Sequence, residues 1–268
     1  MHLRLILLSV IIVLIIASAA HARTICTIIA DAETEKILLQ QGNCKERITP
    51  ASTFKIAISL MGFDSGFLKD EHSPVLAYHE GDVDWGGAAW RQPIDPMNWI
   101  KYSVVWFSQR VTQSLGKERF QRYVSEFQYG NADVSGDSGR DNGMLRSWIN
   151  SSLKISPLEQ VSFLEKVVKR QLPVTAHAFD MTNRLTEVTV LPGGWDIHGK
   201  TGTGSPGEGA FDKAHSYGWF VGWATKKSRT FVFVHLIQDE KLEQGLAGVR
   251  SRDAFLNELP SFLDAQEN

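Results

Sequence analysis

Segments typical of β-strands lie at both ends of the chain, and helical patterns fill the part between them. The strand patterns combine β-branched or aromatic residues with flanking turn residues. They fall at residues 25–29, 36–39, 186–191, 195–200, 217–224 and 230–237. Helical patterns fall at residues 50–61, 97–114, 117–127, 157–170 and 249–263. This order predicts an α/β chain of the α+β type, in which one antiparallel sheet is built from both termini and flanked by helices. We expect a helical subdomain to be inserted at about residues 62–180.

The composition is typical of a single globular domain. Hydrophobic residues make up 43% of the 268 residues and charged residues 22%, so a core can form and disorder is not expected. The formal net charge of −2 offers no basic surface for nucleic acid. The length predicts one domain over residues 23–268.

The first 22 residues have the pattern of a secretory signal peptide. His2 and Arg4 form a positive start, residues 5–16 are apolar, and Ala20-His21-Ala22 is an A-x-A cleavage site. A membrane anchor is the alternative, but the apolar segment is shorter than the roughly 20 residues of a membrane-spanning helix. We therefore expect cleavage after Ala22 and a periplasmic product with no membrane contact.

Cys26 and Cys44 are the only cysteines, and both lie near the expected mature N-terminus. An exported chain with an even number of cysteines is expected to pair them, with two free thiols as the alternative. The disulfide would join the outer ends of the predicted N-terminal hairpin. The 8 histidines contain no H-x-x-x-H pair, so no metal site is expected.

Ser52-Thr53-Phe54-Lys55 is the strongest candidate for a nucleophile with its base. Positions i and i+3 of a helix share one face, so the Ser52 hydroxyl and the Lys55 amine can meet. The same spacing occurs at Ser114–Lys117 and Ser151–Lys154, so the pattern alone is weak. The first pair follows Thr49-Pro50, a helix-start signal. Its apolar neighbours also lower the pKa of the lysine from a reference of about 10.4.

Lys200-Thr201-Gly202 ends a predicted strand and occurs once in the chain. Beside a serine–lysine pair, this triplet supplies a cation and a hydroxyl for a substrate carboxylate and a glycine that permits close backbone approach. An ordinary strand-to-turn triplet is the alternative. Gly202, Gly204 and Gly207 also match G-x-G-x-x-G, but no clean helix follows, so no dinucleotide site is expected.

These motifs occur in the order found in the class D (oxacillinase-type) β-lactamases, which the chain resembles over essentially its whole mature length. The ordered set is Ser52–Lys55, Ser103-Val104-Val105, Tyr129-Gly130-Asn131 and Lys200–Gly202. Similar stretches are Trp148-Ile149, Ser156-Pro157-Leu158-Glu159-Gln160 and Gly218-Trp219-Phe220-Val221-Gly222-Trp223. Class A enzymes are disfavoured because their S-D-N triplet is absent. The resemblance implies a serine β-lactamase and penicillin-binding transpeptidase-like fold, hydrolysis of β-lactam antibiotics, and antibiotic resistance.

The resemblance also implies roles for the matched residues. Ser52 is acylated by the β-lactam carbonyl, and Lys55 carries a CO₂-derived carbamate and acts as general base, with no metal or other cofactor. Only a neutral amine attacks CO₂, which agrees with the apolar surroundings of Lys55. Ser103 relays a proton to the leaving nitrogen, and Trp148 donates its indole N–H to the carbamate.

The remaining matched residues shape the pocket or bind substrate. Val104 and Val105 form its wall, and Ile149 screens the carbamate from water. The backbone N–H groups of Ser52 and Thr203 form the oxyanion hole. The implied carboxylate-binding residues are Lys200, Thr201 and Arg250, beside Gly202. Tyr129-Gly130-Asn131 is expected to shape the floor of the site, as a structural motif.

Two rival functions share this motif set. A penicillin-sensor domain is acylated once and signals, but such a domain is expected to follow several transmembrane segments. A cell-wall transpeptidase or carboxypeptidase has S-x-N at the second motif, where Val105 replaces the asparagine. The sequence leaves open the range of β-lactams and whether the protein is a monomer or a homodimer.

Overall fold

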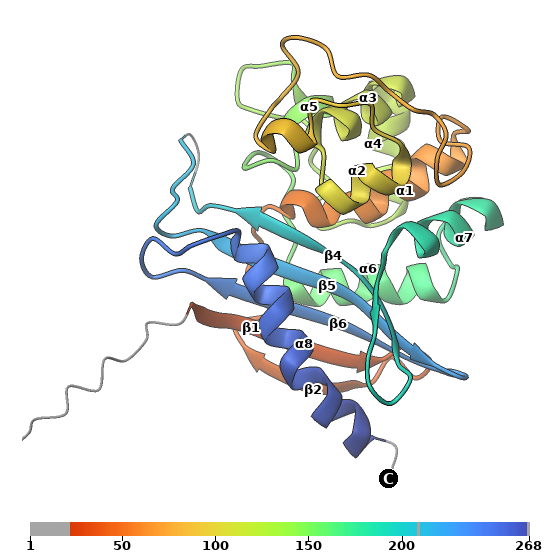
Figure 1. Cartoon of the computed structure of the whole chain (residues 1–268), viewed down its shortest axis with the longest axis vertical. Coiled ribbons are helices and arrows are strands. Elements are labelled where there is room, and N and C mark those ends of the chain that lie inside the picture. Colours follow the sequence, from red (N-terminus) through yellow and green to blue (C-terminus); the bar gives the residue numbers. More distant parts are fainter. Residues whose placement is uncertain (1–21, 208–209, 267–268) are drawn as a thin grey trace, which may run out of the picture.

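The computed structural model describes residues 22–207 and 210–266 (Figure 1). The predicted signal peptide, apart from Ala22, lies outside the described residues. The strands are β1 (Arg23–Asp31), β2 (Ile37–Gly42), β3 (Glu187–Val190), β4 (Asp196–Gly204), β5 (Tyr217–Lys226) and β6 (Arg229–Gln238). They form one sheet in the order β2-β1-β6-β5-β4-β3, and each neighbouring pair is antiparallel. Because β1 pairs with β6, the expected sheet built from both termini is confirmed.

Helices cover both faces of the sheet and form a further layer at one end of it (Figure 1). The helices are η1 (Ala51–Phe54), α1 (Lys55–Asp64), η2 (Gly87–Ala89), α2 (Pro96–Tyr102), α3 (Val105–Leu115), α4 (Lys117–Glu126), α5 (Gly143–Arg146), α6 (Pro157–Val168), α7 (Ala176–Leu185) and α8 (Ala247–Ala265). α8 packs on β4, β5 and β6, whereas α6 packs on β1, β5 and β6. The helical region expected at residues 62–180 therefore includes one helix, α6, that packs on the sheet. None of the helices within the described ranges has the length and hydrophobicity that a bilayer span needs.

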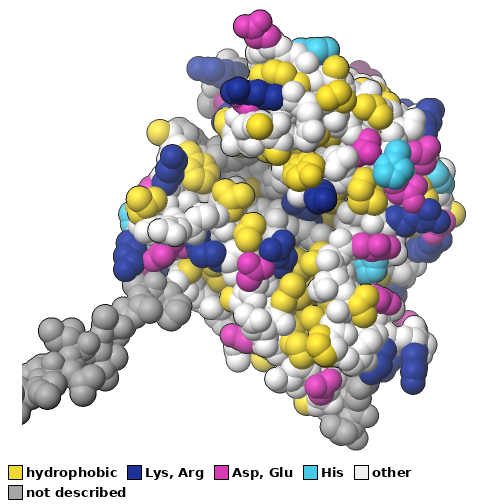
Figure 2. Space-filling model, in the orientation of Figure 1, with side chains coloured by type: hydrophobic (Ala, Val, Ile, Leu, Met, Phe, Trp, Pro, Cys, Tyr) yellow, Lys and Arg dark blue, Asp and Glu magenta, His cyan; other side chains and the backbone are white. Residues whose placement is uncertain are grey.

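The sequence of β5 illustrates why the central strands are continuous apolar segments. Phe220 faces the core formed with Phe233 on β6 and Phe255 on α8. Its neighbours Trp219 and Val221 face the larger core on the other side of the sheet. A strand covered on both faces buries every side chain, so strict alternation with polar residues is lost. On the face drawn in Figure 2, basic and acidic side chains are interspersed.

The helical pattern predicted at residues 97–114 forms two helices rather than one. α2 ends at Tyr102, and α3 begins at Val105. Between them Ser103 adopts a left-handed conformation with φ of 58°, and the backbone N–H of Val104 donates to the Trp99 carbonyl at 3.0 Å. This is the closing pattern in which glycine usually ends a helix. A serine occupies that strained position here.

The Cys26–Cys44 disulfide is present, with a Cα–Cα distance of 5.2 Å. It joins the start of β1 to the segment that follows β2, and both cysteines are buried. The two residues are 18 positions apart, so the bond closes a short loop that includes the first hairpin.

We expect the Cys26→Ala/Cys44→Ala variant to lose about 3 kcal/mol of unfolding free energy, because the open loop adds conformational entropy to the unfolded chain. Urea unfolding of the variant and of the oxidised protein measures the difference, and the reduced protein is the control. Equal urea midpoints for the oxidised and reduced forms would contradict this stabilising role.

Candidate active site

Ser52 and Lys55 meet where η1 passes into α1. Lys55 Nζ donates a hydrogen bond to Ser52 Oγ over 3.0 Å. Ser52 is half-buried, whereas Lys55 has no solvent exposure. Ala51, immediately before the serine, has a φ of 49°, which is unfavourable for a residue with a side chain. Strained backbone of this kind at a reactive side chain indicates a functional constraint.

The surroundings of Lys55 favour its neutral form. Burial holds the pKa of Lys55 well below its usual range, and the positive charge of nearby Lys200 lowers it further. A neutral amine has a free lone pair, whereas an ammonium has none. The pair can therefore move a proton from the serine hydroxyl to the lysine side chain.

The Ser103-Val104-Val105 motif lies at the junction of α2 and α3. The left-handed conformation of Ser103 breaks the helical path there, and Ser103 itself is half-buried. Val104 and Val105 are both buried in the larger core. The motif thus combines one accessible hydroxyl with two apolar side chains.

Trp148 contributes a buried indole N–H that has no hydrogen-bond partner within the described part of the chain. Its ring lies 5.8 Å from the ring of Phe54, the neighbour of Lys55, and 6.4 Å from that of Phe120. Its indole N–H is buried and finds no acceptor among the described residues. Ile149, the next residue, is half-buried and packs against the same core. Buried N–H groups are normally hydrogen-bonded, so this one can hold an additional acceptor.

Tyr129-Gly130-Asn131 holds the loop that follows Trp148. Gly130 has a φ of 57°, and a Cβ atom there would lie 2.1 Å from the Lys154 carbonyl oxygen. Asn131 donates from Nδ2 to the Ser152 carbonyl and accepts from the Lys154 N–H. The Tyr129 hydroxyl accepts a bond from Gln160 on α6. These contacts connect the motif to the 152–154 loop and to α6, and its expected role in shaping the floor of the site stays a prediction.

Gln160 also ties the nucleophile segment to α6. Its Nε2 donates to Thr53 Oγ1 over 3.0 Å, and Thr53 directly follows the serine. α6 itself starts with a capping box formed by Ser156 and Glu159, with Pro157 in its first turn. This helix start explains the Ser-Pro-Leu-Glu-Gln stretch physically.

β4 brings Lys200, Thr201, Gly202 and Thr203 to the nucleophile segment. Lys200 is only 6% exposed, and its Nζ donates to the Thr201 carbonyl over 3.1 Å. Burial, with a smaller effect of Arg252, lowers the pKa of Lys200 to about 7. A Cβ at Gly202 would lie 2.9 Å from the Pro50 carbonyl oxygen, so a glycine lets β4 approach η1 closely.

Thr203 connects β4 with α8, and Arg250 connects α8 with the segment that follows β6. The Thr203 hydroxyl accepts a hydrogen bond from the Gly248 N–H over 2.9 Å. Arg250 forms an ion pair with the buried Asp239, and its Nη1 donates to the Gln244 and Gly245 carbonyls. The guanidinium is thus already paired with a carboxylate, and its binding of a substrate carboxylate stays a prediction.

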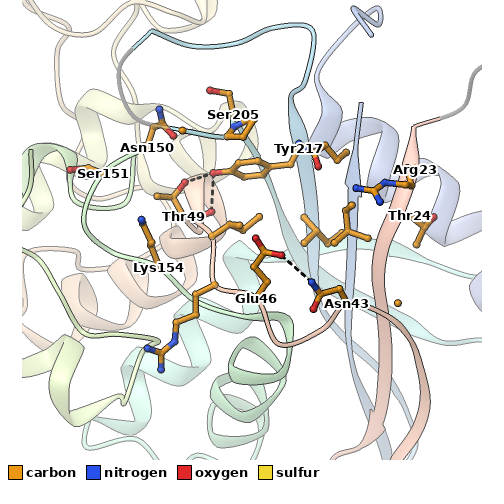
Figure 3. A pocket seen from close by; sticks show the side chains of 18 residues that line it. Arg23, Thr24, Asn43, Glu46, Thr49, Asn150, Ser151, Lys154, Ser205 and Tyr217 are labelled. Carbon is orange, nitrogen blue, oxygen red and sulfur yellow. Dashed lines mark hydrogen bonds between the residues drawn. The ribbon is translucent and has the colours of Figure 1, made fainter. Parts of the chain in front are cut away.

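A cavity of about 670 Å³ lies next to Thr49 (Figure 3). It is lined by the start of β1, the segment after β2, residues of the 150–154 loop and the turn after β4. Neither Ser52 nor Lys55 is among the described residues that line it. The cavity therefore lies beside the nucleophile rather than around it.

Four site contacts were not predicted from the sequence: Gln160 with Thr53, Asp239 with Arg250, Tyr217 with Thr49, and Trp219 with Thr49. Each joins distant parts of the chain or a loop to a helix. The Gly218–Trp223 stretch contained one of these residues but carried no indication of its partner. The described residues contain no cluster of three or more potential metal ligands.

We expect Lys200→Met to raise stability near pH 7 by on the order of a few kcal/mol. The lowered pKa of Lys200 means that between pH 7 and its ordinary value of 10.5 the unfolded chain binds more protons than the folded chain. The destabilisation caused by Lys200 is therefore full below about pH 7 and disappears as the pH rises toward 10.5. Urea unfolding at several pH values should show the difference between the two proteins shrinking with pH. A difference that does not change with pH would refute this expectation.

Comparison with known proteins places this fold and site in a family. A family model of the penicillin binding protein transpeptidase domain matches residues 25–260. Beta-lactamase OXA-9 of Klebsiella pneumoniae is 42% identical over 241 residues, which cover 88% of this chain and 86% of the relative. Beta-lactamase OXA-1 of Escherichia coli is 36% identical over 212 residues, 78% of this chain and 74% of the relative.

A solved structure extends the likeness to three dimensions. The crystal structure of the OXA-427 class D β-lactamase superposes with a TM-score of 0.84 at 44% identity. The superposition covers 90% of this chain and 98% of that one. In this chain a half-buried Ser52 is hydrogen-bonded to the buried Lys55, and the chain belongs to the class D β-lactamases, a family of serine hydrolases.

Proposed function

We propose that this chain hydrolyses β-lactam antibiotics through an acyl-enzyme on Ser52 and so confers antibiotic resistance. The observation that carries the proposal is the 3.0 Å contact between Ser52 Oγ and the fully buried Lys55 Nζ. A hydroxyl is a weak nucleophile at neutral pH, and an adjacent base activates it. The depressed pKa of Lys55 supplies such a base.

Acylation requires a proton to leave Ser52 and another to reach the leaving nitrogen. The Lys55 side chain takes the hydroxyl proton while Oγ attacks the lactam carbonyl carbon. The backbone N–H groups of Ser52 and Thr203 stabilise the oxygen that becomes negative. The carbon–nitrogen bond of the ring then breaks. The proton taken up by the Lys55 side chain passes through the Ser103 hydroxyl to the ring nitrogen, which leaves the Lys55 side chain free to accept a proton again.

Recognition of the drug carboxylate falls to the cationic side of the site. Lys200 is buried and close enough to Lys55 to lower its pKa, and Thr201 adjoins it with a half-buried hydroxyl. A bound carboxylate would favour the charged form of Lys200, whose pKa near 7 leaves it easily protonated. Arg250, held by Asp239, adds a fixed guanidinium, and Val104 and Val105 form an apolar wall.

The residues around Lys55 fit a carbamate on its amine. The neutral amine that burial favours is the form that reacts with CO₂. The unsatisfied indole N–H of Trp148 can donate to an added oxygen, and the positive charge of Lys200 offsets the added negative charge. Such a carbamate would supply an anionic oxygen as the general base, and Ile149 would shield it from water.

Rapid deacylation distinguishes a β-lactamase from a penicillin-binding protein or sensor. Water must attack the ester carbonyl while the Lys55 side chain accepts its proton. The same two backbone N–H groups stabilise the second oxyanion, and Ser52 Oγ leaves with a proton. We also infer that the first 22 residues direct the chain to the periplasm, where the Cys26–Cys44 bond forms.

We expect the protein comprising residues 23–268 to turn over many equivalents of a chromogenic cephalosporin, and Ser52→Ala to turn over none. A progress curve with excess substrate is the measurement. The reason is that Lys55 serves both half-reactions, so the acyl-enzyme does not accumulate. A burst of one equivalent that then stops would instead indicate a sensor or a cell-wall peptidase.

We expect Trp148→Phe to slow deacylation about tenfold or more, with a smaller effect on acylation, because a hydrogen bond to a charged group is lost. Mass spectrometry should then detect an accumulated acyl-enzyme. Stability should change little, because this N–H has no partner among residues 22–207 and 210–266 to lose.

Trp106→Phe is the matched control. It removes an equally buried indole that donates to the Trp90 carbonyl over 3.0 Å, and so should lower stability without trapping the adduct. Equal losses in both half-reactions of Trp148→Phe would indicate that Trp148 only packs.

A further inference from the structure

The backbone carbonyl of Thr49 accepts hydrogen bonds from two side chains of β5. The Tyr217 hydroxyl donates to it over 3.2 Å and the Trp219 indole N–H over 3.1 Å. The Thr49 and Tyr217 hydroxyls are also hydrogen-bonded to each other, and Figure 3 shows both contacts of Tyr217. All three residues are more than nine-tenths buried. The chain just before the nucleophile is therefore connected to the sheet by hydrogen bonds between buried residues.

The same two side chains stand on either side of Thr203 in the sheet. In the register of β4 and β5, Tyr217 and Trp219 pair with the two neighbours of Thr203 along β4. The hydrogen-bonded ladder between the two strands therefore fixes the backbone of Thr203 relative to both side chains.

The segment between Thr49 and Ser52 is too stiff to absorb a displacement. Pro50 has a ring-fixed φ, and its carbonyl accepts bonds from the N–H of Thr53 at 3.2 Å and from its hydroxyl at 2.7 Å. Ala51 is already in a strained left-handed conformation. A shift of Thr49 is therefore passed on to the N–H of Ser52.

We propose that Tyr217 and Trp219 are positioning residues that set the separation between the backbone N–H groups of Ser52 and Thr203. This inference rests on the proposed function, in which these two groups are the oxyanion donors. Donors of this kind act only when they lie about 3 Å from the developing charge, and a misplacement of about 1 Å can reduce the rate 10²-fold. Tyr217 and Trp219 act through Thr49.

The hydrogen bonds from Tyr217 and Trp219 to the Thr49 carbonyl do not change with pH over the range in which the enzyme can be assayed. Burial raises the pKa of Tyr217 to about 12, so its hydroxyl remains protonated, and an indole N–H does not titrate there. Removing either donor should thus lower activity by the same factor at pH 6 and at pH 9. A residue that took part in proton transfer would change the shape of the pH profile.

The test uses Tyr217→Phe, Trp219→Phe and the double variant of the mature protein. A boronic acid inhibitor adds to the nucleophilic serine and places an oxygen where the oxyanion forms, so its affinity reports on the two donors. We expect the affinity and the acylation rate constant to fall at least threefold in each single variant and at least tenfold in the double variant. Non-covalent binding of a small aryl carboxylate, which does not use the donors, should stay within twofold.

Two controls separate positioning from general loss of stability. Trp106→Phe loses an indole bond to the Trp90 carbonyl, and Tyr123→Phe loses a hydroxyl bond to Asp64. Both should lower the melting temperature and leave boronate affinity within twofold. If the double variant fails to fold, the two single variants decide by the same measurements.

The outcomes keep this inference distinct from the proposed function. A folded double variant whose boronate affinity and acylation rate match those of the unsubstituted protein overturns the positioning role, while turnover by the unsubstituted protein leaves the proposed function standing. Failure of the unsubstituted protein itself to be acylated overturns the proposed function and the inference together.

Discussion

The Lys55 amine is buried against the Ser52 hydroxyl, and the rest of the site depends on that contact. A charged lysine without an anionic partner is costly in such a setting, so the side chain becomes neutral and basic toward a nearby proton. Lys200 on β4 adds a second cation that pushes the pKa of Lys55 further down. Trp148, from the helical layer, places an unsatisfied N–H in the same region. The surroundings of the Ser52–Lys55 pair are thus built from a helix, a loop and a strand.

The sheet makes this meeting possible because it is built from both ends of the chain. The hairpin of β1 and β2 leads into η1 and α1, which carry the nucleophile, and β4 and β5 return from the other end to lie against η1. The close approach of β4 needs Gly202, and the Thr49 carbonyl is fixed by β5. The segment that carries the reactive serine is therefore held between the sheet and α6, because Gln160 on α6 donates a hydrogen bond to Thr53, the residue after the serine. Two residues near the chemistry, Ala51 and Ser103, carry backbone strain that this packing sustains.

Local sequence patterns predicted the parts of the fold that depend on residues close together in the chain. The strands follow from β-branched and aromatic runs between turn residues, the Cys26–Cys44 pair from cysteine parity, and the position of the first active-site helix from a helix-start signal. α7 was missed because its buried face includes Thr182, a polar residue satisfied by Ser59 from α1. The break at Ser103 has no local sign, since a serine stands where a glycine usually does. The hydrogen bond between Tyr217 and Thr49 joins residues 168 positions apart. Hydrophobic periodicity is a local pattern and cannot predict a contact over such a separation.

Carbon-13 NMR of the mature protein in labelled bicarbonate most directly tests whether burial makes Lys55 the base. The account predicts a protein-bound carbamate signal that is absent in Lys55→Ala and weakens as the pH falls, because protonation removes the reactive amine. Ser52→Ala should retain the signal, since the serine is not the site of modification. A protein that turns over β-lactams but shows no such signal, or shows it equally in Lys55→Ala, would contradict the role assigned to the buried lysine.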